Sequence, residues 1–522
     1  MLRDPFSRLL VLVVLAGCAG GQVGDVCAGP DDCDDALQCL NRRCAARCVR
    51  APDCGDGYAC DSRGLCLAAT GIAGDRCASE VDCGPGLSCQ IDGAELDSDK
   101  HLRRSCTPQN PTRPAGAECI DGNDCRNGTC ALGHCLDLCK GELDCASGMT
   151  CVDVPSEFAN AALYSACLPA HGPIAWSIPV NQPLAEVQVP VPSMALSAEV
   201  VMRVDDTAQK VGATRVLAMG KTIYSLPCSP LITSEPPCDA TRSLDTYFAN
   251  QLRHAPGLAE SVLAIPSGVA ATPIGPGMYR VTLSSFRSND TQGTAIPRVT
   301  AVIRLDTGSV LDLHFYFLDL SDHPCGAMTG NAKLDASAAA VAPYFQNDYL
   351  GSLRALLSRS AGLELGDRTT YEDVAHLEFD ELEVSDAGSL LKLGKHADGI
   401  NVFFVRSLSP AGLQAFAPNP GPAGVGGTRQ SGIVIGLDTL CYRSWPALAR
   451  LTAHELARYM GLPHNVELDT AHHPGWRDPF SDSDDSSNNL MYFSDRAGPD
   501  APAGIELSPG QRQALVRSAV LR

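Results

Sequence analysis

The spacing of the cysteines constrains this chain more than any other feature of its sequence. Twenty of the 25 cysteines lie between Cys27 and Cys167, and they fall into five groups of four. In each group five residues separate the first two cysteines, and an Asp precedes the second. This regularity identifies an internal repeat. The groups are Cys27, Cys33, Cys39 and Cys44; Cys48, Cys54, Cys60 and Cys66; Cys77, Cys83, Cys89 and Cys106; Cys119, Cys125, Cys130 and Cys135; and Cys139, Cys145, Cys151 and Cys167.

Two chemistries can use cysteines at this density, zinc binding and disulfide formation. Zinc sites usually carry a C-x-x-C pair, and the repeats contain none. The repeats are also poor in Leu, Ile, Val and Phe, so each unit needs covalent cross-links to hold its fold. We therefore predict disulfides over 27–168. Each group of four allows three pairings, and the region could be a stiff spacer, which we favour, or an interaction module.

The N-terminus predicts export from the cytoplasm. Arg3 and Arg8 form a short basic stretch before the apolar run Leu9–Ala16. This order is typical of a signal peptide, here over 1–17. The tetrapeptide at 15–18 resembles the bacterial lipobox, which implies a lipid on Cys18 and a membrane-anchored tether over 18–26. An ordinary signal peptide is the alternative. Since Asp is absent at positions 19 and 20, we expect the outer membrane or cell surface of a bacterium rather than the inner membrane.

The charge of the chain and its remaining cysteines exclude two classes of function. With 40 Lys and Arg against 60 Asp and Glu, the formal charge of −20 excludes a broadly basic nucleic-acid binder. Beyond the repeats and Cys18, Cys228 is expected to pair with Cys238, and Cys325 with Cys441. This scheme leaves no thiol for a cysteine nucleophile.

The rest of the chain predicts two further domains. Prolines recur from 169 to 192, and short apolar runs separated by Gly/Pro turns then predict a β-sandwich, so that linker and sandwich together span 169–305. From 306 to 522 strand and helix patterns alternate, with strands over 310–318, 401–405 and 432–437 and helices over 344–360 and 447–460. This order predicts an α/β domain with a mixed sheet.

Residues 454–464 read HELARYMGLPH. This segment resembles the H-E-x-x-H-x-x-G-x-x-H motif of the metzincin zinc peptidases, and the order of strands and helices resembles the pappalysin-like members. The resemblance implies a zincin fold with an active-site helix, zinc as cofactor, His454 and His464 as ligands, and Glu455 as the base that activates a zinc-bound water. It also implies a turn at Gly461 and a Met-turn at Met491, in the sequence Asn489-Leu490-Met491.

The second histidine of the motif is replaced by Arg458. A guanidinium stays protonated and has no lone pair for a metal. We therefore expect a catalytically impaired domain that binds peptides or partner proteins, in which Arg458 takes the place of the metal and pairs with Glu455. The alternative is an active zinc endopeptidase whose third ligand is His472 or His473, with Asp469 nearby. A structural envelope protein with a chance match to the motif is a third reading.

Three further features near the motif have less specific interpretations. Asp478, Asp482, Asp484 and Asp485 could bind calcium, but their spacing lacks the regularity of a calcium loop, so a solvated turn is expected. Tyr459 and Tyr492 could polarise a substrate carbonyl or simply pack.

Overall fold

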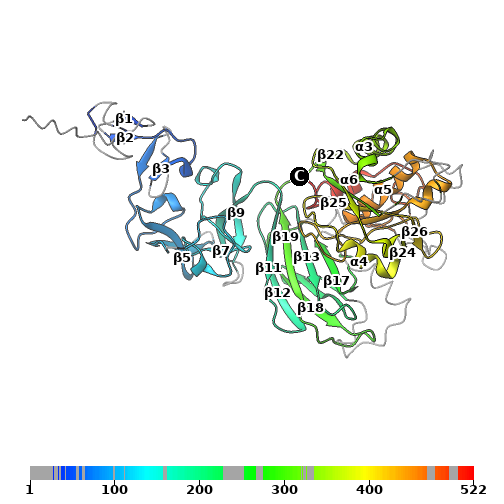
Figure 1. Cartoon of the computed structure of the whole chain (residues 1–522). Coiled ribbons are helices and arrows are strands. Elements are labelled where there is room, and N and C mark those ends of the chain that lie inside the picture. The colour runs from blue at the N-terminus through cyan, green and yellow to red at the C-terminus, as the bar shows by residue number, and fades with distance from the viewer. Residues whose placement is uncertain are drawn as a thin grey trace, which may run out of the picture.

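The computed structural model describes residues 27–28, 33, 37–40, 43–54, 58–60, 65–97, 100–110, 112–156, 162–226, 252–265, 274–318, 320, 325, 334–466, 477–492 and 504–522. Three parts follow one another in space as they do in sequence: the cysteine repeats, two antiparallel sheets, and a part with both helices and strands (Figure 1). The expected signal peptide, Cys18, Cys228 and Cys238 lie outside the described residues. No helix among the described residues is both long and apolar enough to cross a membrane.

The five repeats share one disulfide pattern, in which the first cysteine bonds the third and the second bonds the fourth. The pairs are Cys27–Cys39, Cys33–Cys44, Cys48–Cys60, Cys54–Cys66, Cys77–Cys89, Cys83–Cys106, Cys119–Cys130, Cys125–Cys135, Cys139–Cys151 and Cys145–Cys167. The prediction of disulfides is confirmed, and the structure selects one of the three pairings. Each repeat also contains one hairpin: β1 (Gln38–Leu40) with β2 (Arg43–Ala45), β3 (Tyr58–Cys60) with β4 (Cys66–Ala68), β5 (Leu87–Leu96) with β6 (Leu102–Pro108), β7 (Cys130–Ala131) with β8 (His134–Cys135), and β9 (Met149–Pro155) with β10 (Leu163–Pro169).

The recurring Asp before the second cysteine caps the loop that the first two cysteines enclose. In the third repeat, the Asp82 carboxylate accepts hydrogen bonds from the backbone N–H groups of Ala78, at 2.7 Å, and Ser79, at 3.1 Å. Asp53, Asp124 and Asp144 accept equivalent bonds in the second, fourth and fifth repeats. In the second repeat, the donors hold the pKa of Asp53 below its usual value. The Asp therefore satisfies loop amides that have no partner in a helix or sheet.

The repeats are not a simple string of independent units. Arg104 of the third repeat is buried and donates to the carbonyls of Ala78 and, at 3.1 Å, of Cys139 in the fifth. Leu138, Val154 and Leu168 are buried in the same apolar cluster as Val200 and Leu283, which belong to the antiparallel sheets. The expectation that the repeats have too few apolar residues to contribute to a core is therefore wrong for the third to fifth units. These units pack on the sandwich instead of standing apart from it.

The middle part consists of two antiparallel sheets that share this core. The first sheet has the order β11 (Pro173–Ile178), β19 (Arg298–Arg304), β13 (Ser197–Arg203), β17 (Glu260–Ile265). The second has the order β12 (Leu184–Val191), β18 (Gly277–Phe286), β14 (Lys210–Ala218), β15 (Lys221–Ser225), with β16 (Gly257–Leu258) also paired to β14. Inward-facing residues of both sheets are fully buried, which gives the β-sandwich that the short apolar runs predict.

The C-terminal part is built on a five-stranded mixed sheet, with small two-stranded pairs beside it. Its order is β23 (Thr370–Val374), β21 (Leu313–Leu318), β25 (Ile400–Val405), β28 (Ile433–Gly436), β27 (Ala415–Phe416). The first four strands are parallel, and β27 is the antiparallel edge. The two-stranded pairs are β20 (Val310–Leu311) with β22 (Glu364–Leu365), and β24 (Glu381–Glu383) with β26 (Ser407–Ser409).

Most of the helices pack on one face of the mixed sheet, and the helix Ala387–Leu391 packs on the other. The helices are α2 (Ala336–Ala339), a π-helical segment (Tyr344–Leu350) that continues into α3 (Gly351–Ala361), α4 (Ala387–Leu391), α5 (Trp445–Tyr459) and α6 (Pro509–Leu515). Leu353 of α3 and Leu448 of α5 share a buried cluster with Phe315 and Phe404 of the sheet. Cys325 is bonded to Cys441, as the cysteine count predicts.

The sandwich and the C-terminal part are joined by buried polar contacts. The Glu199 carboxylate of β13 accepts a hydrogen bond from the Ala423 N–H at 3.1 Å, and Glu260 of β17 accepts one from the Arg429 N–H at 2.7 Å. Arg304 of β19 is fully buried and donates to the Ser518 carbonyl at 3.0 Å. Burial raises the pKa of Glu199 to about 7. The two parts therefore meet through charged side chains that their junction desolvates.

Candidate functional site

Helix α5 presents the HELARYMGLPH segment. It begins after Ser444, whose side chain accepts a hydrogen bond from the Ala447 N–H, and Pro446 occupies its first turn. Leu448, Leu456 and nearby apolar residues are buried against the sheet, and His454 lies on the same buried side. The apolar spacing that predicts this helix thus also fixes the direction in which the first motif histidine points.

The two motif histidines lie close together. The ring centroids of His454 and His464 are 5.4 Å apart. His454 Nδ1 lies 2.7 Å from the Leu490 carbonyl, and the Asn465 N–H donates to the Met491 carbonyl at 3.1 Å. The turn at 489–491, which the resemblance identifies as a Met-turn, therefore contacts both histidine-bearing segments.

The state of His454 suits a metal ligand. Burial, together with the neighbouring His464 and the positive charge of Arg458, lowers the pKa of His454 to about 3, so the ring is neutral. A carbonyl can only accept a hydrogen bond, so Nδ1 carries the proton and Nε2 keeps its lone pair. A backbone carbonyl behind a histidine is a common outer partner of a ligating imidazole.

Gly461 produces the change of direction that brings His464 back toward α5. Its φ of 99° is a left-handed conformation that favours glycine. The Gly461 N–H donates to the Arg458 carbonyl at 2.9 Å, and the Leu462 N–H reaches back to Ala457 at 3.0 Å. These bonds end the helix where the motif predicts, and the chain then turns toward the side of α5 that carries His454.

Arg458 and Glu455 do not form the expected ion pair. Both side chains are partly buried, and no hydrogen bond or ion pair joins them in the part of the chain that the structure describes. Burial raises the pKa of Glu455 to about 7, and the charge of Arg458 opposes that rise. Arg458 thus acts on both Glu455 and His454 through its charge rather than through a direct contact.

The described residues of the motif supply fewer ligands than catalytic zinc needs. A catalytic zinc needs three protein ligands, and the described residues of the motif supply the two imidazoles of His454 and His464 beside a guanidinium. The candidate substitutes His472 and His473, with Asp469, lie outside the described residues.

Two of the less specific features have structural explanations. Tyr459 is buried and donates to the Pro422 carbonyl at 2.8 Å, so it packs the helix against a loop and cannot polarise a substrate at the histidine pair. In the acidic segment, the Asp478 carboxylate accepts hydrogen bonds from the Gln511 side chain and the Phe480 N–H. Asp482 accepts one from the Gly510 N–H at the start of α6, and Asp484 accepts one from the Ser486 N–H. Asp485 forms an ion pair with Arg477. Each of these carboxylates therefore has a partner within the protein.

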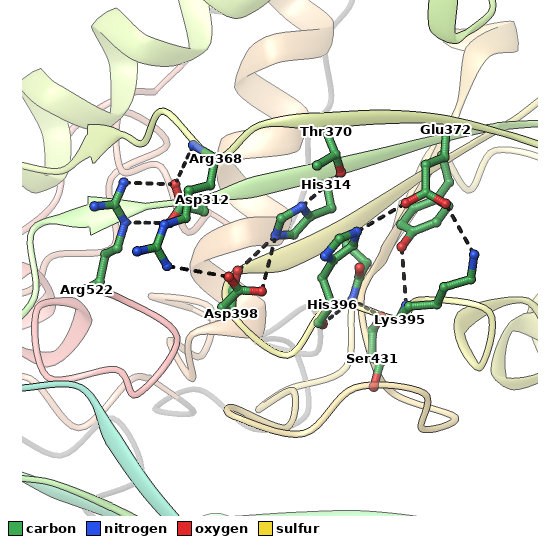
Figure 2. Close-up of polar contacts among 12 residues, drawn as sticks. Asp312, His314, Arg368, Thr370, Glu372, Lys395, His396, Asp398, Ser431 and Arg522 are labelled. Atoms are coloured by element: carbon green, nitrogen blue, oxygen red, sulfur yellow. Dashed lines mark hydrogen bonds and ion pairs between the residues drawn. The ribbon is translucent and has the colours of Figure 1, made fainter.

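A second polar cluster, which the sequence analysis missed, lies at the beginning of the parallel strands (Figure 2). The rings of His314 and His396 are stacked, with centroids 3.7 Å apart. His314 contacts Thr370 at 3.0 Å, and His396 contacts the Glu372 carboxylate at 3.2 Å. Lys395 lies 3.4 Å from the other oxygen of Glu372. The histidine inside the otherwise apolar run of β21 is the sequence feature from which this cluster could have been predicted.

The charges of this cluster are matched within the protein. Burial lowers the pKa of His314, and the adjacent His396 lowers it further. Burial alone would raise the pKa of Glu372, but the hydrogen bond from His396 and the charge of Lys395 bring it below its usual value. Beside the histidines, the Asp312 carboxylate pairs with Arg522 at 2.6 Å. This pair holds Arg522 beside the segment that leads into β21.

The comparisons with known proteins do not assign the chain to a family. A scan against protein-family models finds no family that matches it, and a search of curated proteins finds no matching relative.

Proposed function

We propose that this protein is a lipid-anchored envelope protein whose C-terminal domain is a metzincin-like peptidase domain without catalytic zinc. In this proposal the domain binds a peptide or a partner protein and does not cleave it. Cys18 would carry the lipid, and the cysteine repeats would connect the anchor to the sandwich. The ten disulfides of the repeats support an oxidising location outside the cytoplasm.

One observation carries the proposal. His454 and His464 converge, and a carbonyl orients His454, yet Arg458 stands where the third ligand of the motif would be. A fixed cation that lowers the pKa of His454 also disfavours a divalent cation beside it. The arrangement thus keeps the scaffold of a zinc site while opposing the metal.

The decisive measurement is the zinc content of the oxidised full chain and of its Arg458→His variant, by plasma mass spectrometry after dialysis against trace zinc. The proposal predicts almost no zinc in the native chain and about one zinc per chain in the variant, because the third imidazole completes a three-ligand site. Arg354→His is the matched control, since Arg354 is exposed on α3 and this change should add no zinc.

Two results would contradict the proposal. About one zinc in the native chain, together with cleavage of casein that Glu455→Gln abolishes, would establish the alternative of an active endopeptidase. In that case His472→Ala and His473→Ala would identify the missing ligand. Zinc in neither the native chain nor Arg458→His would argue against a metzincin-like site altogether.

A further inference from the structure

A pocket of about 330 Å³ lies between the sandwich and the C-terminal part, outside the motif. We call it the interdomain pocket and define it by Arg253, Leu258, Phe416, Pro418, Arg429 and Gln430, which are among its lining residues. Its volume falls within the range of small-ligand sites, roughly 300 to 1,000 Å³, and such sites favour domain junctions.

The charge of the interdomain pocket is opposite to that of the whole chain. Its lining includes Arg253 and Arg429 but neither Asp nor Glu, although the chain has a formal charge of −20. The carboxylates of Glu260 and Asp478 interact electrostatically with Arg429 and Arg253, but neither carboxylate lines the pocket, so the surface that a ligand meets is positive. The ligand that fits this surface is an anion.

The Arg429 guanidinium is held in position by its surroundings. The Arg429 N–H donates to Glu260 at 2.7 Å, which fixes the backbone. The guanidinium lies directly over Gly388, because a Cβ added there would come within 2.9 to 3.1 Å of its Nε, Nη2 and Cζ atoms. Within the described parts of the chain, this guanidinium forms neither a hydrogen bond nor an ion pair. A planar, pre-positioned guanidinium suits bidentate recognition of a carboxylate.

The remaining walls combine an apolar surface with an open mouth. Phe416, Pro418 and Val262 supply apolar surface inside the pocket. Leu258, Ser385 and Asn419 also line the pocket and are exposed, so the pocket opens to solvent. An anionic head beside an apolar body would therefore fit inside, while a chain attached to it could leave through the mouth.

We propose that the interdomain pocket binds the C-terminal carboxylate of a peptide whose last residue is apolar. The carboxylate lies against Arg429, and the last side chain lies against Phe416 and Pro418. Arg253, which donates to the Arg477 carbonyl at 2.7 Å, adds positive charge to the same wall. The pocket wall is also joined to the end of α5, since Asn419 donates to the Leu462 carbonyl at 3.1 Å. The inference goes beyond the proposed function, because none of its residues belongs to the histidine motif and the binding needs no zinc.

The test is calorimetric titration of the oxidised full chain with three probes. Acetyl-Gly-Phe, with a free carboxylate, should bind at least about 10-fold more tightly than its C-terminal amide, because the amide loses the charge-assisted hydrogen bonds. 3-Phenylpropionate carries the same head and ring without a peptide, and it should bind more weakly than acetyl-Gly-Phe. Equal binding of acid and amide, or no binding of the acid at 5 mM, would overturn the proposal. Tighter binding of 3-phenylpropionate would replace the peptide by a small aromatic acid.

Variants locate the binding. Arg429→Gln should weaken acetyl-Gly-Phe about 10-fold, and Arg354→Gln, at an exposed site on α3, should leave it unchanged. Ser385 is exposed at the mouth, so Ser385→Glu and Ser385→Lys alter the local charge without altering the core. The acidic variant should weaken binding and the basic variant should not. Unchanged affinity in both Arg429→Gln and Ser385→Glu would place the ligand elsewhere, whatever the zinc content proves to be.

Discussion

The first two cysteine repeats and the C-terminal part represent two different ways to hold a fold. In the repeats the buried clusters consist of cysteines: Cys27, Cys33 and Cys44 in the first unit, and Cys48, Cys54 and Cys66 in the second. In the C-terminal part a large apolar cluster spans the mixed sheet and its helices, and one described disulfide, Cys325–Cys441, adds to it. Cross-links replace burial where the chain is too short to form a core.

The third to fifth repeats lie between these two extremes. Cys83, Cys89 and Cys106 are buried in the same cluster as Trp176 and Val200 of the sandwich. Leu102 and Leu132 extend that cluster through the repeats. A unit that docks on a neighbouring domain thus gains apolar burial in addition to its two disulfides. The comparison predicts a graded dependence on disulfides from the N-terminus toward the sandwich.

Reduction of the disulfides should have the largest effect on the stability of the repeats, and it tests directly how their dependence on disulfides changes along the chain. In each of the first two repeats both bonds close loops with separations of 11 or 12 residues, and such a bond contributes about 3 kcal/mol. We therefore expect the reduced chain to lose amide protection completely in the described residues between 37 and 66, while β21, β25 and α5 stay protected. Hydrogen exchange with mass spectrometry on oxidised and reduced chain measures both.

The same experiment contains its control. The third repeat should lose protection only in part, because Leu102 and its cysteines remain against the sandwich core. If all five repeats open equally, the shared cluster contributes nothing to their stability. If 37–66 keeps its protection after reduction, the first two units do not depend on their cross-links.

A change of pH should have an intermediate effect on the free energy of unfolding, through Glu199 at the junction of the sandwich with the C-terminal part. The ordinary pKa of a glutamate is 4.5, and that of Glu199 is about 7 in the folded chain. Below pH 4.5 the carboxyl is neutral in both states. Above pH 7 it is ionised in both, and the folded state alone bears the cost of burying the charge. The contribution of Glu199 to stability therefore declines as pH rises from 4.5 through 7.

Glu199→Gln should reduce this decline, because the amide keeps an acceptor for the Ala423 N–H and never ionises. The gain at pH 8 relative to pH 5 should be on the order of 2 to 3 kcal/mol by denaturant unfolding. Glu186→Gln, at a partly exposed pair with Arg280, is the matched control and should change little. An equal gain at both pH values would show that burial of the Glu199 charge is not the cause.

How much the sequence predicts also differs between the two regions. Cysteine spacing predicts the repeats and their disulfides, but the three pairings of each unit are equivalent in sequence, so only the structure selects one. Apolar periodicity predicts α5, and Gly461 predicts its end. By contrast, His314, Glu372 and His396 meet only because β21, β23 and β25 pair in parallel. The interdomain pocket likewise depends on how two domains dock, which no local pattern specifies.

The smallest effect on stability is expected from the Asp that caps the loop in the second to fifth repeats. Asp82→Ala removes the acceptor for the Ala78 and Ser79 N–H groups and an ion pair to Lys140 at 3.2 Å, while both disulfides of the unit remain. The cost should be about 1 to 2 kcal/mol. Exchange of these two amides should accelerate by about 5- to 30-fold, and Asp82→Asn, which keeps an acceptor oxygen, should accelerate it less. Unchanged exchange in the alanine variant would mean that the disulfides alone fix the loop, and the recurring Asp would then have no structural role in this repeat.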